Sequence, residues 1–155
     1  MRVPAAIFLC LTLAACSIFT RSIERPTASV RDVSMTTAGF GGVRGALRLD
    51  VMNPNGFGVP LSGIDWQLSV GGARAVRGTV ELSQTIPARG TAPVTTTLAI
   101  DPQDAVAVAR ALAMGASSYQ LSARLHFSTP IGPLDVDLIH AGNLDDAGGL
   151  FGALD

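Results

Sequence analysis

The chain has 155 residues, of which 48% are hydrophobic and 15% are charged, and its formal net charge is −1. This length is enough for one small domain with its own hydrophobic core. The near-neutral charge argues against nucleic acid as a partner, because the chain lacks the excess of basic side chains that attracts a polyanion.

Residues 1–15 have the pattern of a secretion signal. Arg2 supplies a positive start, residues 3–13 form a short apolar run, and small residues precede Cys16. The run is too short to span a bilayer as a mature helix. The sequence Leu-Ala-Ala-Cys resembles a bacterial lipobox, in which the cysteine is acylated, for example with palmitate, and becomes the new N-terminus. An ordinary signal peptide with a cysteine nearby is the alternative.

Lipidation of Cys16 would make a membrane a partner of the protein. Cys10 lies in the segment expected to be removed, so no thiol would remain for a disulfide or a thiolate metal site. Ser17 follows the expected anchor and resembles a sorting signal for the outer membrane. We therefore expect a lipid-anchored protein of the bacterial cell envelope, on the periplasmic face of the outer membrane. Residues 16–25 lack strong periodicity and are interpreted as the lipidated tether.

Alternating apolar and polar residues predict seven β-strands between residues 26 and 144. The expected strands cover residues 28–36, 43–51, 64–70, 73–82, 94–100, 119–128 and 134–138. A bulge is expected between Val30 and Val33, and another at Gly78. Gly71-Gly72 has the composition of a hairpin turn.

The stretch VMNPNGFGVPLSGIDW, residues 51–66, is predicted to cross from one sheet to the other. Pro54 cannot donate a hydrogen bond to a sheet, and Asn55 and the glycine after it tolerate positive φ. Pro60-Leu61 and Gly63 are expected to form two further corners before the next strand begins. No acid, base or ligand cluster gathers nearby, so we interpret this stretch as structural.

One helix is predicted after the fifth strand, over residues 102–114. Asp101 is a good N-cap, Pro102 suits the first helical position, and Gly115 can end the helix. The helix carries few charges and is apolar on most sides. We therefore expect it to pack across an open edge or end of the sheets.

The predicted elements indicate an all-β fold, an antiparallel β-sandwich with one short α-helix. By alternation Trp66 lies on the core face of its strand, so packing is favoured over binding for this side chain. Residues 145–155 are interpreted as a flexible C-terminal tail. Within this tail Leu150, Phe151 and Leu154 have near-helical spacing, which leaves docking on a partner or a membrane as an alternative.

An ordered set of turn and strand residues resembles the LEA type 2 family, also called the WHy (water stress and hypersensitive response) domain. The matching positions are Asn53, Pro54, Asn55, Pro60, Leu61, Gly63, Ile64, Asp65, Trp66, Gly71, Gly72, Gly78, Tyr119 and the turn Thr129-Pro130-Ile131-Gly132. The family usually has a tyrosine or a similar residue where Trp66 stands.

The resemblance covers residues 26–144 and implies an immunoglobulin- or fibronectin-III-like sandwich of about seven strands. It also implies a role in tolerance of desiccation and other stress. Bacterial members of the family are often exported lipoproteins. The family has no established catalytic residues, so the resemblance assigns none to this chain.

The sequence contains no pattern typical of catalysis or cofactor binding. No serine lies in a Gly-x-Ser-x-Gly elbow, and no glycine-rich phosphate loop precedes a helix. His126 is expected on the solvent face of its strand, opposite Asp135 or Asp137, as a solvated cross-strand pair rather than a metal site. His140 is expected to be an ordinary surface side chain. We therefore expect no enzyme activity, no cofactor and no metal.

The leading hypothesis is a non-enzymatic, membrane-anchored lipoprotein that acts in stress tolerance or envelope maintenance. One alternative is a carrier of an apolar ligand or lipid, because an exported sandwich beside a membrane could open a slot between its sheets. Another alternative is an accessory subunit of an envelope assembly.

Overall fold

A computed structural model describes residues 22–38, 42–72 and 76–143. The predicted signal peptide, Cys16 and the tail at 145–155 lie outside these residues. The elements, in chain order, are β1 (Thr27–Ala38), β2 (Gly42–Met52), β3 (Val59–Val70), β4 (Val76–Ile86), β5 (Thr91–Ile100), α1 (Pro102–Ala113), β6 (Ser118–Thr129) and β7 (Gly132–Asn143). No helix in this part of the chain is long and apolar enough to cross a membrane.

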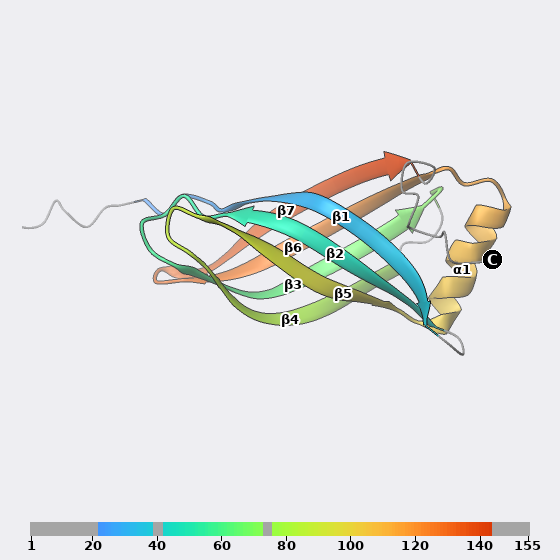
Figure 1. The fold of residues 1–155 in the computed structure, drawn as a ribbon, viewed down its shortest axis with the longest axis horizontal. Helices are drawn as coiled ribbons and strands as arrows, with labels where there is room; N and C mark the ends of the chain where they lie inside the picture. The colour runs from blue at the N-terminus through green and yellow to red at the C-terminus, as the bar shows by residue number, and fades with distance from the viewer. Residues whose placement is uncertain (1–21, 39–41, 73–75, 144–155) are drawn as a thin grey trace, which may run out of the picture.

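The strands form two antiparallel sheets that pack face to face (Figure 1). One sheet has the strand order β1-β2-β5, and the other has the order β4-β3-β6-β7. The chain passes between the sheets after β2, after β4 and, through α1, after β5, so each sheet combines strands that are distant in sequence. The prediction of an all-β antiparallel sandwich with one short helix is confirmed.

The core fills the space between the sheets with side chains from alternate positions of each strand. The largest fully buried ones are Leu47, Leu49, Val51, Leu61, Ile64, Leu68, Ile86, Leu98, Leu121, Leu125 and Phe127. Burying each such side chain contributes about 1.5–3 kcal/mol. The alternation read from the sequence is therefore the pattern that builds this core, and Trp66 belongs to it with 3% of its surface exposed.

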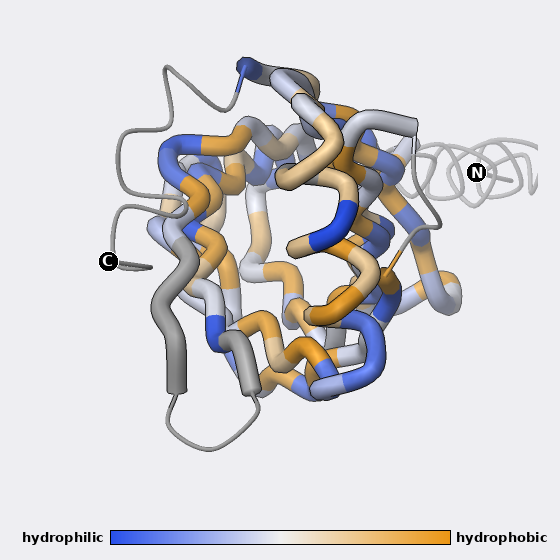
Figure 2. Tube along the Cα trace, turned by 90° about the vertical axis from the view of Figure 1, so that its right-hand side faces the viewer, coloured by the Kyte–Doolittle hydropathy of each residue, from blue (hydrophilic) through white to orange (hydrophobic). Residues whose placement is uncertain are grey.

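The two ends of the sandwich differ. At one end, which we call the loop end, lie the connections 53–58, 87–90 and 130–131 together with residues 22–26, which lead into β1 (Figure 1). At the other end, the helix end, α1 lies across the opening between the sheets (Figure 2). Its inner face packs Ala105, Val108 and Ala111 against the core, as expected for a helix that covers an end of the sheets.

The predicted start of the third strand at residue 64 is wrong, because β3 begins at Val59 and runs without interruption to Val70. Pro60-Leu61 and Gly63 therefore form no corners. The pairing register shifts between Leu61 and Gly63, and both Gly63 and Ile64 are buried. A bulge inserts one extra residue into a strand and reverses the alternation of buried and exposed residues. In the sequence alone, this break in the alternation resembles a boundary of the strand.

Other boundaries and turns differ in smaller ways. The last strand, β7, extends to Asn143 instead of ending at residue 138, and α1 ends at Ala113, two residues before Gly115. The expected irregularity after Val30 is present in β1. Gly78 forms no bulge, because its pairing register with β3 is continuous. Gly71 and Gly72 have φ of +56° and +74°, as their hairpin composition predicted.

Candidate functional site

The asparagine turn between β2 and β3 is held together by the buried side chain of Asn53. Its Nδ2 donates hydrogen bonds to the carbonyl oxygens of Phe57 at 2.7 Å and Pro87 at 3.1 Å. Its Oδ1 accepts from the backbone N–H and the side-chain amide of Asn55, both at 3.0 Å. Its own backbone N–H donates to the carbonyl of Gly90 at 2.9 Å. One side chain thus joins the β2–β3 turn to the β4–β5 connection.

Asn55 holds the segment that precedes β1. Its Nδ2 donates to the carbonyl oxygen of Glu24 at 2.8 Å, and the backbone N–H of Glu24 donates to its Oδ1 at 2.9 Å. The side-chain amide of Asn55 therefore bonds both the N–H and the C=O of Glu24, as the backbone of a neighbouring strand would. Pro26, two residues further on, is buried. The chain consequently enters the sandwich along a fixed path at the loop end.

The other residues of the predicted family motif lie close to this turn in sequence but have different surroundings. Pro54 is half-buried in the turn, Pro60, Leu61, Gly63, Asp65 and Trp66 lie within β3, and Gly72 lies in the turn after it. Pro60 is exposed, whereas Leu61 and Trp66 belong to the core. Gly63 sits at the bulge, where an added Cβ would lie 3.1 Å from the carbonyl oxygen of Val80. The structure thus distributes the motif between the turn, the core and the outer face of the sheet.

A row of polar side chains crosses the outer face of the four-stranded sheet, and we call it the polar row: Thr79, Asp65, His126 and Asp135. His126 Nδ1 lies 2.8 Å from Asp135 Oδ1, and His126 Nε2 lies 3.0 Å from Asp65 Oδ2. Thr79 Oγ1 donates to Asp65 Oδ1 at 2.7 Å. The four side chains come from β4, β3, β6 and β7, so the row links every strand of this sheet.

The position of the imidazole between two carboxylates favours its protonated form. A neutral imidazole has one N–H and can donate to one carboxylate, whereas the imidazolium donates to both. The hydrogen bond with Asp135, followed by that with Asp65, raises the pKa of His126 above its usual 6.5. The hydrogen bond from Thr79, followed by that from His126, lowers the pKa of Asp65. The polar row is therefore an electrostatic cross-link between strands.

The sequence predicted half of this arrangement. His126 pairs with Asp135 in the β6–β7 register, as expected for the last hairpin. Asp65 was expected on the solvent face of its strand but not beside His126, because β3 and β6 are neighbours only through the sheet order. Asp137 pairs instead with Arg124, with 2.7 Å between Oδ1 and Nε. The missed partner carried no local sequence signal.

The side chains of the polar row contact one another, and this limits how they could bind a metal ion or take part in catalysis. Each ring nitrogen of His126 faces a different carboxylate, so the three groups do not converge on one point. Within the described ranges, no group of three His, Cys, Asp or Glu side chains is arranged to hold a metal ion. The imidazole is 32% exposed and lies on an open sheet surface, not in a cleft of the kind that catalytic groups occupy.

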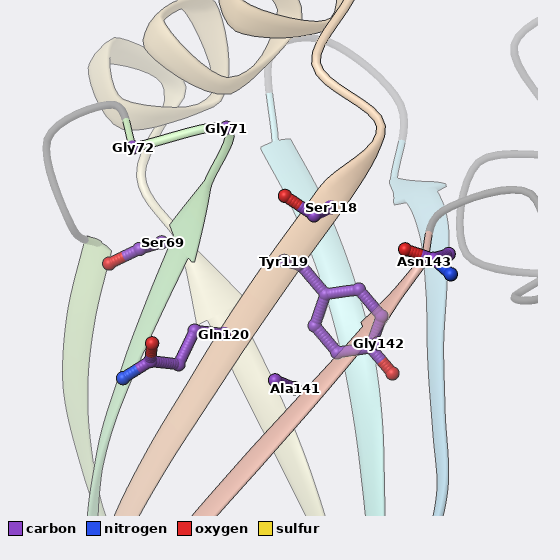
Figure 3. Close-up of a pocket in the computed structure, with 9 residues that line it drawn as sticks. All are labelled: Ser69, Gly71, Gly72, Ser118, Tyr119, Gln120, Ala141, Gly142 and Asn143. Atoms are coloured by element: carbon purple, nitrogen blue, oxygen red, sulfur yellow. The ribbon is translucent and has the colours of Figure 1, made fainter.

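The described residues line two open depressions on the surface of the sandwich. One, of about 610 Å³, lies on the outer face of the four-stranded sheet between Arg77, Arg124 and Ile139. The other, of about 440 Å³, lies at the helix end beside Tyr119 and Gly142 (Figure 3). The first is lined by charged side chains of both signs, among them Asp65, Arg77, Arg124 and Asp137, whereas the second is lined by uncharged residues.

The ring of Tyr119 lines the second depression. Figure 3 shows its ring beside Gly142, and a Cβ added at residue 142 would lie 2.8 Å from the ring. The ring of His140 lies tilted against it, with 6.0 Å between the ring centroids. His140 is thus half-buried against an aromatic ring, so the expectation of an ordinary surface side chain is wrong. Its inward facing follows from the β6–β7 register, in which His140 lies opposite the buried Leu121.

Comparison with known proteins gives a family and a shared fold. The family model described as "Late embryogenesis abundant protein" (LEA_2) matches residues 48–142. No curated protein matches the chain. The family match begins before the asparagine turn and ends at Gly142, so it includes the turn, the bulged strand and the polar row.

Several solved structures share the fold at low sequence identity. The solution structure of a late embryogenesis abundant (LEA) protein has 23% identity and a TM-score of 0.62, and the match covers 90% of this chain and 83% of that one. An Arabidopsis thaliana protein has 19% identity and a TM-score of 0.67, with coverage of 79% and 82%. A protein from Archaeoglobus fulgidus has 10% identity and a TM-score of 0.59, with coverage of 79% and 95%.

Proposed function

The chain belongs to the LEA_2 family of late embryogenesis abundant proteins, and from this membership together with the lipobox-like sequence before Cys16 we propose that it is a lipid-anchored protein of the bacterial cell envelope. In this proposal its role is non-enzymatic and serves tolerance of desiccation and other stress, or maintenance of the envelope. Cys16 carries the lipid, and the sandwich acts through its surface on the periplasmic side of the outer membrane.

The proposal is carried by the lipobox-like sequence Leu-Ala-Ala-Cys that ends at Cys16, and the short path from Cys16 to a fixed point on the sandwich determines which end would face the membrane. Residue 22, where the described chain begins, follows Cys16 after only about six residue steps, a span of roughly 20 Å when extended. Asn55 then holds Glu24 by two hydrogen bonds at the loop end. A lipid on Cys16 would therefore keep the loop end of the sandwich next to the membrane.

The outer faces of the sandwich support a role without catalysis. Several of their charged side chains are paired across neighbouring strands, among them Arg31 with Asp50 at 2.9 Å and Arg124 with Asp137 at 2.7 Å. In the polar row, both nitrogens of His126 are engaged by carboxylates. Such pairs link neighbouring strands on an open sheet surface, whereas catalytic groups usually lie in a cleft.

Globomycin, which blocks cleavage of lipoprotein signal peptides, tests whether Cys16 is lipidated. Wild-type cells treated with it should accumulate a lipid-modified precursor, and a Cys16→Ser variant should not. A wild-type protein that is found unmodified in the soluble fraction would contradict the lipid anchor.

The stress role is tested separately, by deleting the gene and measuring survival after drying and osmotic shock. Unchanged survival would remove the support for that role.

The exposed face of α1 supports a second candidate, an accessory subunit of an envelope assembly. Val106 in α1 is 60% exposed, and Met114, directly after the helix, is 82% exposed. Contiguous exposed apolar patches mark sites of contact with another protein or a membrane. Crosslinking in cells from a photoreactive residue at position 106 tests this candidate, with the exposed Gln103 as the control position.

The third hypothesis, a carrier of apolar ligands, is tested by native mass spectrometry for a lipid that co-purifies.

A further inference from the structure

Ile131 lies at the tip of the turn between β6 and β7 with 81% of its surface exposed. Thr129 Oγ1 donates to the carbonyl oxygen of Gly132 at 2.6 Å, and Gly132 has φ of +125°, so the turn is tight. Tight turns usually carry glycine, proline, asparagine, aspartate or serine, each for a backbone reason. An exposed isoleucine serves no such purpose and contributes nothing to the core. Its position suggests a contact with an apolar phase outside the protein.

This turn lies at the end of the sandwich where the chain enters. Phe127, near the end of β6, pairs with Leu61, near the start of β3, and the asparagine turn directly precedes β3. Asn55 in that turn binds Glu24. Figure 1 shows the β6–β7 turn and residues 22–26 at the same end of the molecule. The exposed isoleucine therefore lies at the loop end, where a tether from Cys16 would reach the sandwich.

Other exposed side chains at the loop end suit a bilayer with anionic headgroups. Met52, at the end of β2, is 46% exposed. Arg25 and Arg89 are exposed, and Glu24 is the single acidic residue among positions 22–26, 53–58, 87–90 and 130–131. Two arginines and one glutamate leave a net charge of +1 on this end. Apolar side chains flanked by arginines are the composition of surfaces that bind at the membrane interface.

We propose that the loop end docks on the surface of an anionic phospholipid bilayer, with Ile131 inserted between the headgroups. This inference rests on the proposed lipidation of Cys16, which brings the loop end to the membrane. One acyl chain binds a membrane only marginally, so a second contact strengthens attachment. It also gives the sandwich a defined orientation, with α1 and its exposed apolar face pointing away from the bilayer.

The test uses the full mature, lipidated protein in vesicles of phosphatidylethanolamine and phosphatidylglycerol. A cysteine at position 131 carries an environment-sensitive nitrobenzoxadiazole dye, and the vesicles contain a lipid with a nitroxide at a shallow acyl-chain position. The matched control places the same dye at Ile139, which is 69% exposed but lies on the outer face of β7. We expect a blue shift and loss of emission by quenching for Ile131→Cys, and neither change for Ile139→Cys.

Equal emission from the two positions, without quenching, would overturn the proposal. A blue shift at position 131 in native membranes but not in lipid vesicles would also overturn it, because a protein would then be the occupant. The mass of the mature chain reports lipidation independently. If Cys16 proves to be unmodified, a Cys16→Ser chain coupled to the vesicle lipid through its N-terminus allows the same comparison, so the loop end can be tested even when the lipoprotein proposal fails.

Discussion

The indole ring of Trp66 lies against Gly78, its direct partner on the neighbouring strand, and a Cβ at residue 78 would be 2.7 Å from Cζ2 of the ring. The same relationship recurs between Tyr119 and Gly142, where the distance from the added Cβ to Cε1 is 2.8 Å. In each pair an aromatic ring occupies the space that the side chain of its cross-strand partner would need. Glycine in these strands thus allows close packing and does not mark a bulge.

Gly78→Ala should therefore destabilise the fold by about 1–3 kcal/mol, because the added methyl group overpacks a site closed by a rigid indole. Urea unfolding followed by Trp66 fluorescence measures the change. Gly56→Ala is the matched control, since a Cβ there meets only the flexible side chain of Arg89 at 3.7 Å. Equal unfolding midpoints for the two variants would contradict the proposed role of Gly78.

Asn53→Ala should cost about 1–3 kcal/mol for each buried group that it leaves without a hydrogen bond. Those groups include the backbone N–H of Asn55, which donates to Oδ1 of Asn53 in a buried hydrogen bond in the native state. Equilibrium unfolding in urea measures the loss. Gln84→Ala removes a side-chain-to-backbone hydrogen bond on an exposed surface, so it should have a much smaller effect. A similar loss in both variants would show that burial of Asn53 is not decisive.

Asn55→Ala should release the segment before β1 while the sandwich remains folded. The Glu24 amide donates to Asn55 Oδ1, so its hydrogen exchange should become faster in the variant. Asn55→Asp keeps this acceptor and loses the donor to the carbonyl of Glu24 and to Oδ1 of Asn53, so the Glu24 amide should stay better protected than in Asn55→Ala. Hydrogen exchange measured by NMR distinguishes the two. Unchanged exchange at Glu24 in Asn55→Ala would show that Asn55 does not hold this segment.

The polar row should make stability depend on pH. The pKa of His126 is raised in the folded protein, so the folded state holds this proton more tightly than the unfolded chain. The resulting stabilisation is complete below about pH 6.5 and is lost as the pH rises through the pKa of the folded state. The urea midpoint of the wild type should accordingly fall as the pH is raised above this value.

His126→Gln should flatten that part of the pH profile, because it removes the titrating group. Asp135→Asn removes the partner that raises the pKa most and should reduce the slope while leaving the histidine in place. Urea midpoints measured across the pH range for all three proteins provide the test. A wild-type slope retained in His126→Gln would assign the pH dependence to another group.

The prediction of lipidation at Cys16 rests on the order of residues around it and not on the fold. Cys16 lies outside the described ranges, so its lipidation stays a prediction, as do the outer-membrane address and the stress role. The folded part adds one constraint, since Glu24 is bound at the loop end and limits how far the sandwich can move from a lipidated cysteine.

Local patterns in the chain were sufficient to predict the seven strands, the helix and the side of most strands that faces the core, because period-two alternation and helix-capping residues involve only near neighbours. They also indicated the pairing of His126 with Asp135, since a hairpin joins neighbours in sequence. The folded structure was needed to show that β3 continues through Gly63, because a bulge is recognised from the partner strands. The same holds for the approach of Asp65 to His126 and of Asn55 to Glu24, which are 61 and 31 residues apart. Contacts across such separations depend on how the two sheets order their strands, and no local pattern of residues records that order.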